Sequence, residues 1–200
     1  MSLKIFISVI LGTLVGYLFL PDTISSSIGT AIDLGLMLLL FFVGMDIGKQ
    51  KDVFSKVKKM GIKILLVPFA VIIGSLVGGI IAGIILKMPL NESGAVAGGL
   101  GWYTLSSTIL LAENYVELSA LAFLANVFRE IIALISIPLI AKYVGNLEAV
   151  STGGATAMDT SLPVISASTN PQTAIIAFVT GVICTASVPI IVPLILKLSF

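Results

Sequence analysis

This chain has 200 residues, of which 58% are hydrophobic and only 10% are charged, and its mean hydropathy is +1.17. Soluble domains carry about 25% charged residues, so this chain lacks the polar side chains that a water-exposed surface needs. The composition excludes a soluble globular domain and predicts an integral membrane protein of several α-helical spans. With a formal net charge of +1 and no interleaved pattern of basic and aromatic residues, we expect no nucleic-acid partner.

Residues 1–88 contain three apolar runs that each approach or exceed the ~20 residues needed to cross a bilayer. The first run lacks the marks of a cleaved signal peptide, because Lys4 is its only basic flank and no Ala-x-Ala site precedes Pro21. We therefore expect residues 1–88 to form three transmembrane helices. The runs are Leu3–Leu20, Ile28–Met45 and Ile64–Leu86.

Lysine residues gather between the second and third predicted spans, where Asp52 alone opposes them. By the positive-inside rule, this loop at 49–63 and the N-terminus, with Lys4, lie in the cytoplasm. A patch for anionic lipid is an alternative interpretation of the same loop. The lysines concerned are Lys49, Lys51, Lys56, Lys58, Lys59 and Lys63.

After Pro89 two segments rich in Gly, Ser and Thr, at 94–112 and 151–166, are each followed by a long apolar run, near 117–142 and 172–197. A shift of 55 positions superposes the two parts without a gap. It places Gly98-Gly99 on Gly153-Gly154, Ser106 on Ser161, Ala122-Phe123 on Ala177-Phe178, and Pro138-Leu139-Ile140 on Pro193-Leu194-Ile195. We infer an internal duplication, with repeats at 92–145 and 147–200 in a single membrane domain.

The sequence leaves open whether each broken segment crosses the membrane or re-enters it from one side. Re-entry gives one crossing per repeat and inverted topology, whereas crossing gives parallel repeats. The charges favour inversion, because re-entry places Glu113 and Glu117 outside and Lys142 inside. The predicted fold is an all-α polytopic membrane protein with three N-terminal helices and two repeats, each a Gly-broken segment followed by a helix.

The glycines predict breaks in these segments. Unwound backbone persists inside a bilayer only where protein or a water-filled cavity covers it, and paired breaks in two repeats indicate a transport site. The alternative is that each Gly pair only allows close helix packing. Two pairs in register, each followed by hydroxyl groups, favour the site. The predicted breaks are at Gly98, Gly99, Gly101, Gly153 and Gly154.

Two acidic residues fall inside the predicted membrane segments, where charge is costly and indicates function. Asp159 lies in the second broken segment, and Glu130 lies near the middle of the helix at 117–142. Their equivalents in the other repeat are Thr104 and Thr185, so each repeat supplies one acid at a non-equivalent position. A carboxyl group in low dielectric favours its protonated form, whereas a nearby cation favours the charged form. A site that exchanges protons for a cationic solute follows, which is the chemistry of a proton antiporter.

Other polar residues complete the predicted site. Asn126 lies four residues before Glu130 on the same helix face, and Arg129, the single arginine, projects about 100° away. For Arg129, pairing with a neighbour and contact with substrate remain equal alternatives. Trp102 and Tyr103 either anchor the chain at the interface or line the site. The remaining candidates are Thr104, Ser106, Ser107, Thr156, Thr160 and Ser161.

Several kinds of chemistry are excluded. The chain has no histidine, and Cys184 is its one cysteine, so we expect no metal, no disulfide and no cofactor. Asp46 and Asp159 raise the possibility of a membrane aspartyl protease, but the Gly-x-Gly-Asp signature is missing before Asp159. We therefore predict that the protein is not an enzyme.

Three blocks of the sequence are distinctive: Gly98-Gly99-Leu100-Gly101-Trp102-Tyr103-Thr104-Leu105-Ser106-Ser107, then Arg129-Glu130, then Gly154-Ala155-Thr156-Ala157-Met158-Asp159 with Leu162-Pro163-Val164. With these blocks the chain resembles the LysO-type lysine exporter family over nearly its whole length. The resemblance implies export of L-lysine and its toxic analogues across the cytoplasmic membrane of a bacterium or archaeon, coupled to protons or Na⁺. The acidic residues important to that family fall on Glu130 and Asp159. The chain resembles the C-terminal two-thirds of longer members. We expect a homodimer or a small partner subunit to supply the additional helices, with the alternative that these helices are dispensable.

We therefore predict a lysine exporter in which Asp159 and Glu130 bind the ammonium groups of lysine and exchange them for protons. Arg129 or the N-terminus of a half-helix would bind the α-carboxylate. Two alternatives remain: an exporter of another cationic or polar metabolite, and a non-transporting subunit that needs a partner.

Overall fold

The computed structural model describes residues 61–198 continuously and only scattered single positions before residue 60. Within 61–198 every regular element is helical, which confirms the predicted α-helical fold class. The long helices are α4 (Leu66–Leu86), α7 (Val116–Tyr143) and α10 (Pro171–Leu196). The short elements are η2 (Gly61–Leu65), α5 (Leu90–Ala97), α6 (Tyr103–Ala112), α8 (Asn146–Gly153), η3 (Gly154–Met158) and α9 (Leu162–Ser168).

The three long helices have the length and composition of membrane spans. At about 1.5 Å per residue they are roughly 31–42 Å long, enough to cross a hydrocarbon core of about 30 Å. Large apolar side chains such as Phe69, Ile85 and Ile190 stay exposed along them, as expected of helices solvated by lipid. The chain is therefore a multi-pass membrane protein, and its third predicted span is confirmed as α4. The first two predicted spans and most of the loop at 49–63 lie outside the described residues.

Unusual backbone conformations mark the ends of the helices. α4 ends at Lys87, which adopts the left-handed conformation with a φ of 56°. Between α5 and α6, Leu100 and Gly101 have φ values of 51° and 102°. In the second broken segment Gly154 has a φ of 60°, and the chain then tightens into η3. A branched residue such as Leu100 adopts positive φ only where its surroundings hold it there.

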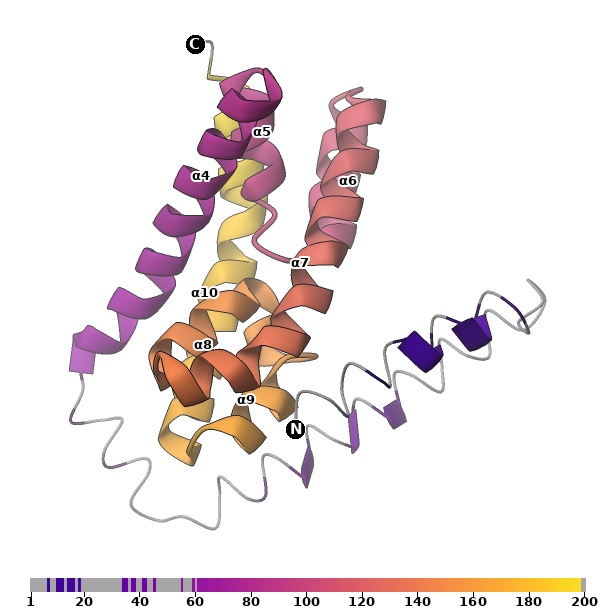
Figure 1. Ribbon diagram of the computed structural model, residues 1–200. Coiled ribbons are helices and arrows are strands. Elements are labelled where there is room, and N and C mark those ends of the chain that lie inside the picture. The colour runs from indigo at the N-terminus through magenta and orange to yellow at the C-terminus, as the bar shows by residue number, and fades with distance from the viewer. Residues whose placement is uncertain are drawn as a thin grey trace.

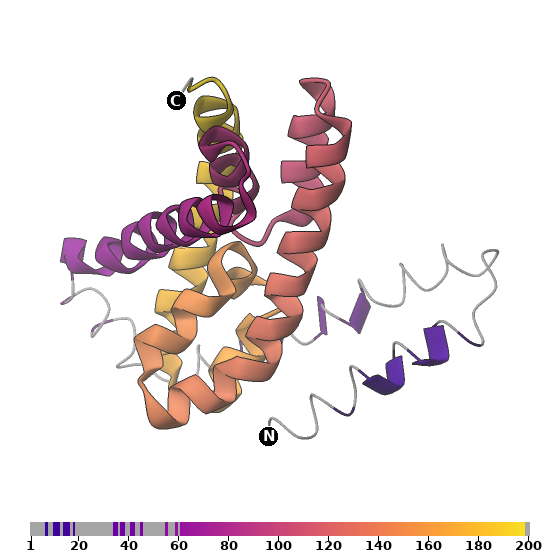
Figure 2. The ribbon, with the colours of Figure 1, turned by 45° about the horizontal axis from the view of Figure 1, so that its top comes forward.

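Each broken segment folds back on itself, and the two lie at opposite ends of the molecule (Figure 1). α5 and α6 lie with the end of α10 and the start of α7, whereas α8 and α9 lie with the start of α10 and the end of α7. The same grouping is visible in the turned view (Figure 2). A hydrogen bond of 3.2 Å from Asn91 Nδ2 to the Leu196 carbonyl oxygen fixes the start of α5 to the end of α10. We name the turn at 98–102 the first tip and the turn at 153–160 the second tip.

Small residues let the helices approach closely, as is usual in membrane bundles. A Cβ added at Gly79 would collide with Ala97, and one added at Gly83 would collide with Ser93, so α4 packs directly on α5. α10 is the central helix and packs against α4, α5, α6, α8, α9 and η3. Its buried Val188 belongs to an apolar cluster that also includes the first tip. This packing holds both tips in the middle of the bundle.

Candidate functional site

The two tips touch through their backbones. The Ala155 N–H donates to the Leu100 carbonyl oxygen at 2.8 Å, and these residues are 55 positions apart, the offset that superposes the two repeats. A Cβ at Gly101 would lie 3.3 Å from the Gly153 carbonyl oxygen, and one at Gly154 would collide with the Leu100 oxygen. The glycines predicted to break the helices therefore allow the contact between the tips.

Asn126 on α7 holds the first tip in place. Its side chain is 3% exposed, and its Oδ1 accepts the Gly101 N–H at 2.8 Å. Its Nδ2 donates to the carbonyl oxygens of Val96 at 3.2 Å and Ala122 at 2.9 Å. Unwound backbone inside a membrane needs such partners. Asn126 thus supports the backbone of the tip.

Buried hydroxyl groups hold each tip from within. Ser106 is fully buried beneath Gly99 and donates to a carbonyl oxygen of its own turn. Ser161, its equivalent in the other repeat, is equally buried and shares a hydrogen bond of 2.7 Å with Thr156 Oγ1. Ser107 likewise donates to a neighbouring carbonyl oxygen, at 3.0 Å. These hydroxyls satisfy backbone and side-chain groups near the tips.

A cavity of about 240 Å³, here called the acidic cavity, lies between the two tips, α7 and α10. Its lining residues are Gly101, Trp102, Tyr103, Thr104, Glu130, Ala155, Thr156, Met158, Asp159, Thr160 and Thr185. Two of these are acidic, and no lysine or arginine of the described residues lines the cavity. Thr104 and Asp159 are related by the 55-residue offset, and so are Glu130 and Thr185. Positions that the predicted repeats make equivalent therefore face one cavity.

Glu130 and Asp159 meet on one hydroxyl group. Thr160 Oγ1 donates to Glu130 Oε1 and lies 3.3 Å from Asp159 Oδ1. The Thr160 backbone N–H donates to the same Asp159 oxygen at 2.5 Å. A hydroxyl has one proton, whereas two carboxylates offer four oxygens. The pair therefore keeps acceptors for a proton or for the N–H groups of an ammonium ion.

The start of α6 forms another wall of the acidic cavity. Trp102, Tyr103 and Thr104 line it, and the Tyr103 ring packs edge-on against Phe123, with 5.3 Å between ring centroids. No side chain caps the N-terminus of α6, so its first backbone N–H groups are available to a ligand. The sequence left open whether Trp102 and Tyr103 anchor the chain at the membrane interface or line the site. In the structure both residues line the acidic cavity.

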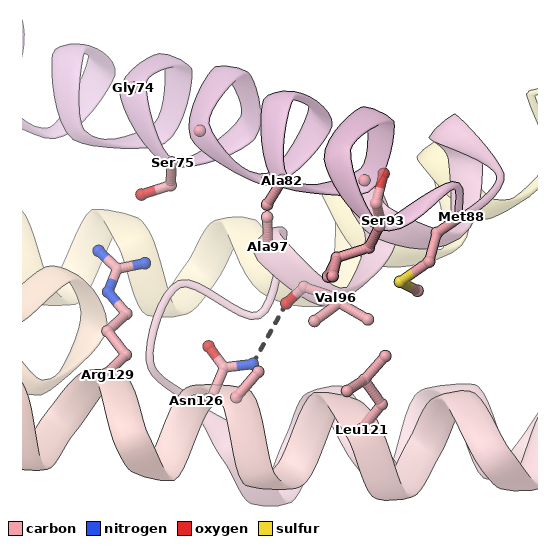
Figure 3. A pocket seen from close by; sticks show the side chains of 15 residues that line it. Gly74, Ser75, Ala82, Met88, Ser93, Val96, Ala97, Leu121, Asn126 and Arg129 are labelled. Carbon is pink, nitrogen blue, oxygen red and sulfur yellow. Dashed lines mark hydrogen bonds between the residues drawn. The ribbon is translucent and has the colours of Figure 1, made fainter.

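Arg129 faces a different part of the protein. It lines two other cavities, of about 380 and 370 Å³. Figure 3 shows the larger one, with Arg129 and Asn126 on α7 pointing toward α4. Its guanidinium lies against the second tip, since a Cβ at Gly154 would be 2.7 Å from Arg129 Nη2. Adjacent helix residues point about 100° apart, which is why Glu130 enters the acidic cavity and Arg129 does not.

The predicted site residues therefore separate into two groups. Those that line the acidic cavity are Gly101, Trp102, Tyr103, Thr104, Glu130, Thr156, Asp159 and Thr160. Those that lie outside it, in the tips or in other cavities, are Gly98, Gly99, Ser106, Ser107, Asn126, Arg129, Gly153, Gly154 and Ser161. The predicted site did not include Thr185, which lines the acidic cavity and whose hydroxyl lies 3.8 Å from Met158 Sδ. Its position 55 residues after Glu130 was the signal that could have identified it.

Known proteins resemble this chain along most of its length. A family model described as "Lysine exporter LysO" matches residues 6–196. The lysine exporter LysO of Escherichia coli (strain K12) is 35% identical over 158 residues, which is 78% of this chain and 52% of that protein. A putative lysine exporter of Haemophilus influenzae is 31% identical over 156 residues, which is 78% of this chain and 79% of that protein. No solved structure matches the chain.

The chain thus spans about half the length of the Escherichia coli relative. The match confirms the resemblance seen in the Gly-Trp-Tyr and Gly-Ala-Thr-Ala-Met-Asp blocks. By the extent of the family match, this chain belongs to the LysO lysine exporter family, whose members are transporters and not enzymes.

Proposed function

We propose that this protein exports L-lysine and lysine analogues across the cytoplasmic membrane in exchange for protons. The observation that carries the proposal is the meeting of Glu130 and Asp159, one from each repeat, on the Thr160 hydroxyl. The names of the relatives support lysine as the substrate. Because the chain covers 52% of the Escherichia coli relative, its substrate and coupling are proposals.

The chemistry of the acidic cavity fits such an exchange. Two carboxylates close together in low dielectric cannot both stay ionised without a cation, and no cation of the described residues lines this cavity. An ammonium group supplies a compact positive charge with three N–H donors. The pair is therefore neutralised either by protons or by lysine. Occupancy by one displaces the other, which couples their movements.

The N-terminus of α6 fits the α-carboxylate of lysine. A helix N-terminus carries a partial positive charge and free N–H groups that favour a carboxylate. α6 has 10 residues and no side-chain cap, and Trp102, Tyr103 and Thr104 at its start line the cavity. Arg129, the other candidate, lines different cavities. At about 240 Å³ the cavity is smaller than the roughly 300–1,000 Å³ of drug-sized sites, which suits a single amino acid.

We further propose that the two broken segments re-enter the membrane from opposite sides as inverted repeats. α5, α6, α8 and α9 have 7 to 10 residues each, and 10 residues extend about 15 Å, half of a ~30 Å core. α7 and α10 run in opposite directions between the two ends (Figure 1). The hydrogen bond between the equivalent residues Leu100 and Ala155 supports a two-fold axis between the tips. The site would lie on that axis, near the middle of the membrane.

The test is lysine flux in liposomes that contain the purified full chain alone. We expect uptake of labelled lysine when a proton gradient is imposed, together with proton movement in the opposite direction. A sodium gradient at constant pH decides whether Na⁺ replaces protons. Cadaverine, which is lysine without the α-carboxylate, is expected to be a poor substrate because it leaves the α6 N-terminus unoccupied. Folded protein that gives no lysine flux under either gradient would contradict the proposal and would favour a partner subunit or another substrate.

A further inference from the structure

Arg129 is a half-buried charge that the proposed exchange of lysine for protons does not use. It is the single arginine of the chain, and its guanidinium stays charged in proteins. Neither of the cavities that it lines contains an acidic side chain, and within residues 61–198 it makes no hydrogen bond or ion pair. A charge inside a membrane is costly, so a residue such as Arg129 is a candidate for a functional role.

The position of Arg129 relative to the tips indicates what this function is. Asn126 and Arg129 line the larger cavity on the α4 side, and each also contacts one of the two tips. Gly101 and Ala155 line the acidic cavity, while Asn126, which binds the Gly101 N–H, lines the larger one together with Arg129. The side chains of Asn126 and Arg129 therefore lie between the larger cavity and the tips. Gly154 has no side chain, so the guanidinium rests directly against it.

We propose that Arg129 is an electrostatic barrier that stops protons and other cations from leaking past the tips between the acidic cavity and the α4-side cavity. This inference rests on the proposed role of Glu130 and Asp159 as the cation-binding pair. Any cation that leaves the pair through the tips must pass close to a fixed positive charge in low dielectric, where repulsion is strong. Fixed positive charges exclude protons and cations from other pores in this way. Lysine and protons would then cross only by exchange on the acid pair.

The experiment measures passive proton flux, without lysine, in liposomes that contain the full chain and a pH-sensitive dye. A potassium diffusion potential drives proton entry. Arg129→Gln removes the charge, and Arg129→Lys keeps it. Lys142→Gln is the matched control, because it removes a positive charge from the exposed end of the same helix. Arg129→Gln combined with Asp159→Asn tests whether a leak passes through the acid pair.

We expect Arg129→Gln to raise the proton flux at least about tenfold. Wild type, Arg129→Lys and Lys142→Gln should keep a low proton flux. Adding Asp159→Asn to Arg129→Gln should abolish the leak. If Arg129→Gln elutes as a folded protein in size-exclusion chromatography and its passive proton flux equals that of wild type, the proposed barrier is refuted. A leak of the same size in Arg129→Lys overturns its electrostatic basis. Because lysine is absent from this assay, a leak that depends on Arg129 supports the barrier even if wild type fails to transport lysine.

Discussion

The hydroxyl of Thr160 is the group that joins the two acids, and Thr160→Val removes it while keeping the size of the side chain. Thr160 Oγ1 contacts oxygens of both Glu130 and Asp159. Hydrogen bonds to charged groups contribute about 1.5–3 kcal/mol, which corresponds to roughly 10- to 150-fold in affinity. Without this bond the two carboxylates lose their shared partner and no longer converge on one ammonium group. We therefore expect the KM for lysine to rise by about 10- to 150-fold.

The assay is the initial rate of labelled lysine exchange in proteoliposomes, measured over a range of lysine concentrations. Thr160→Ser retains the hydroxyl and should transport like wild type. Thr185→Val makes the same substitution in the same cavity, where Met158 Sδ, at 3.8 Å, is the one hydrogen-bond partner of the hydroxyl among the described residues. Such a weak bond predicts a change of about fivefold at most. A wild-type KM in Thr160→Val would refute the bridging role of Thr160, and so would an equal rise of KM in Thr185→Val.

Further predictions concern the tips. Asn126→Ala leaves the buried Gly101 N–H unpaired, at a cost of about 1–3 kcal/mol, so we expect a thermal midpoint roughly 3–10 °C lower by thermal-shift assay. Asn91→Ala removes a bond at a helix end and should lower the midpoint less; an equal fall would contradict the role of Asn126 in holding the first tip. Gly154→Ala puts a Cβ into the other tip and should abolish most lysine flux. Gly78→Ala meets nothing within 4 Å and serves as its control; full flux in both would refute the close contact.

Much of the helical architecture could be predicted from the sequence, because each element has a strong local signal. Apolar runs of more than 20 residues predicted α4, α7 and α10, whose ends fall within a few residues of those expected. At two of the glycines where breaks were predicted, Gly101 and Gly154, the backbone has positive φ. The left-handed Leu100 could not be predicted, because it follows from the contact between the tips and not from residue preference.

The candidate site was harder to predict, because its members come together only through tertiary packing. Glu130 and Asp159 each stood out as a charge in an apolar segment, but nothing in the sequence placed them on the Thr160 hydroxyl. Asn126 shares a helix face with Glu130, and this spacing led to its prediction as a ligand. In the structure, the Gly101 N–H and two carbonyl oxygens occupy its amide instead. The predicted internal repeat was the one long-range signal, and it could have placed Thr185 in the site.

The role of the acid pair is tested most directly by coupled lysine and proton flux in proteoliposomes of Glu130→Gln and Asp159→Asn. Glu117→Gln, an exposed acid on the same helix as Glu130, is the matched control. We predict that each of the two cavity variants loses both fluxes while remaining inserted and folded, and that the control keeps both. Lysine flux that survives in both cavity variants and still responds to the pH gradient would contradict proton exchange on this pair.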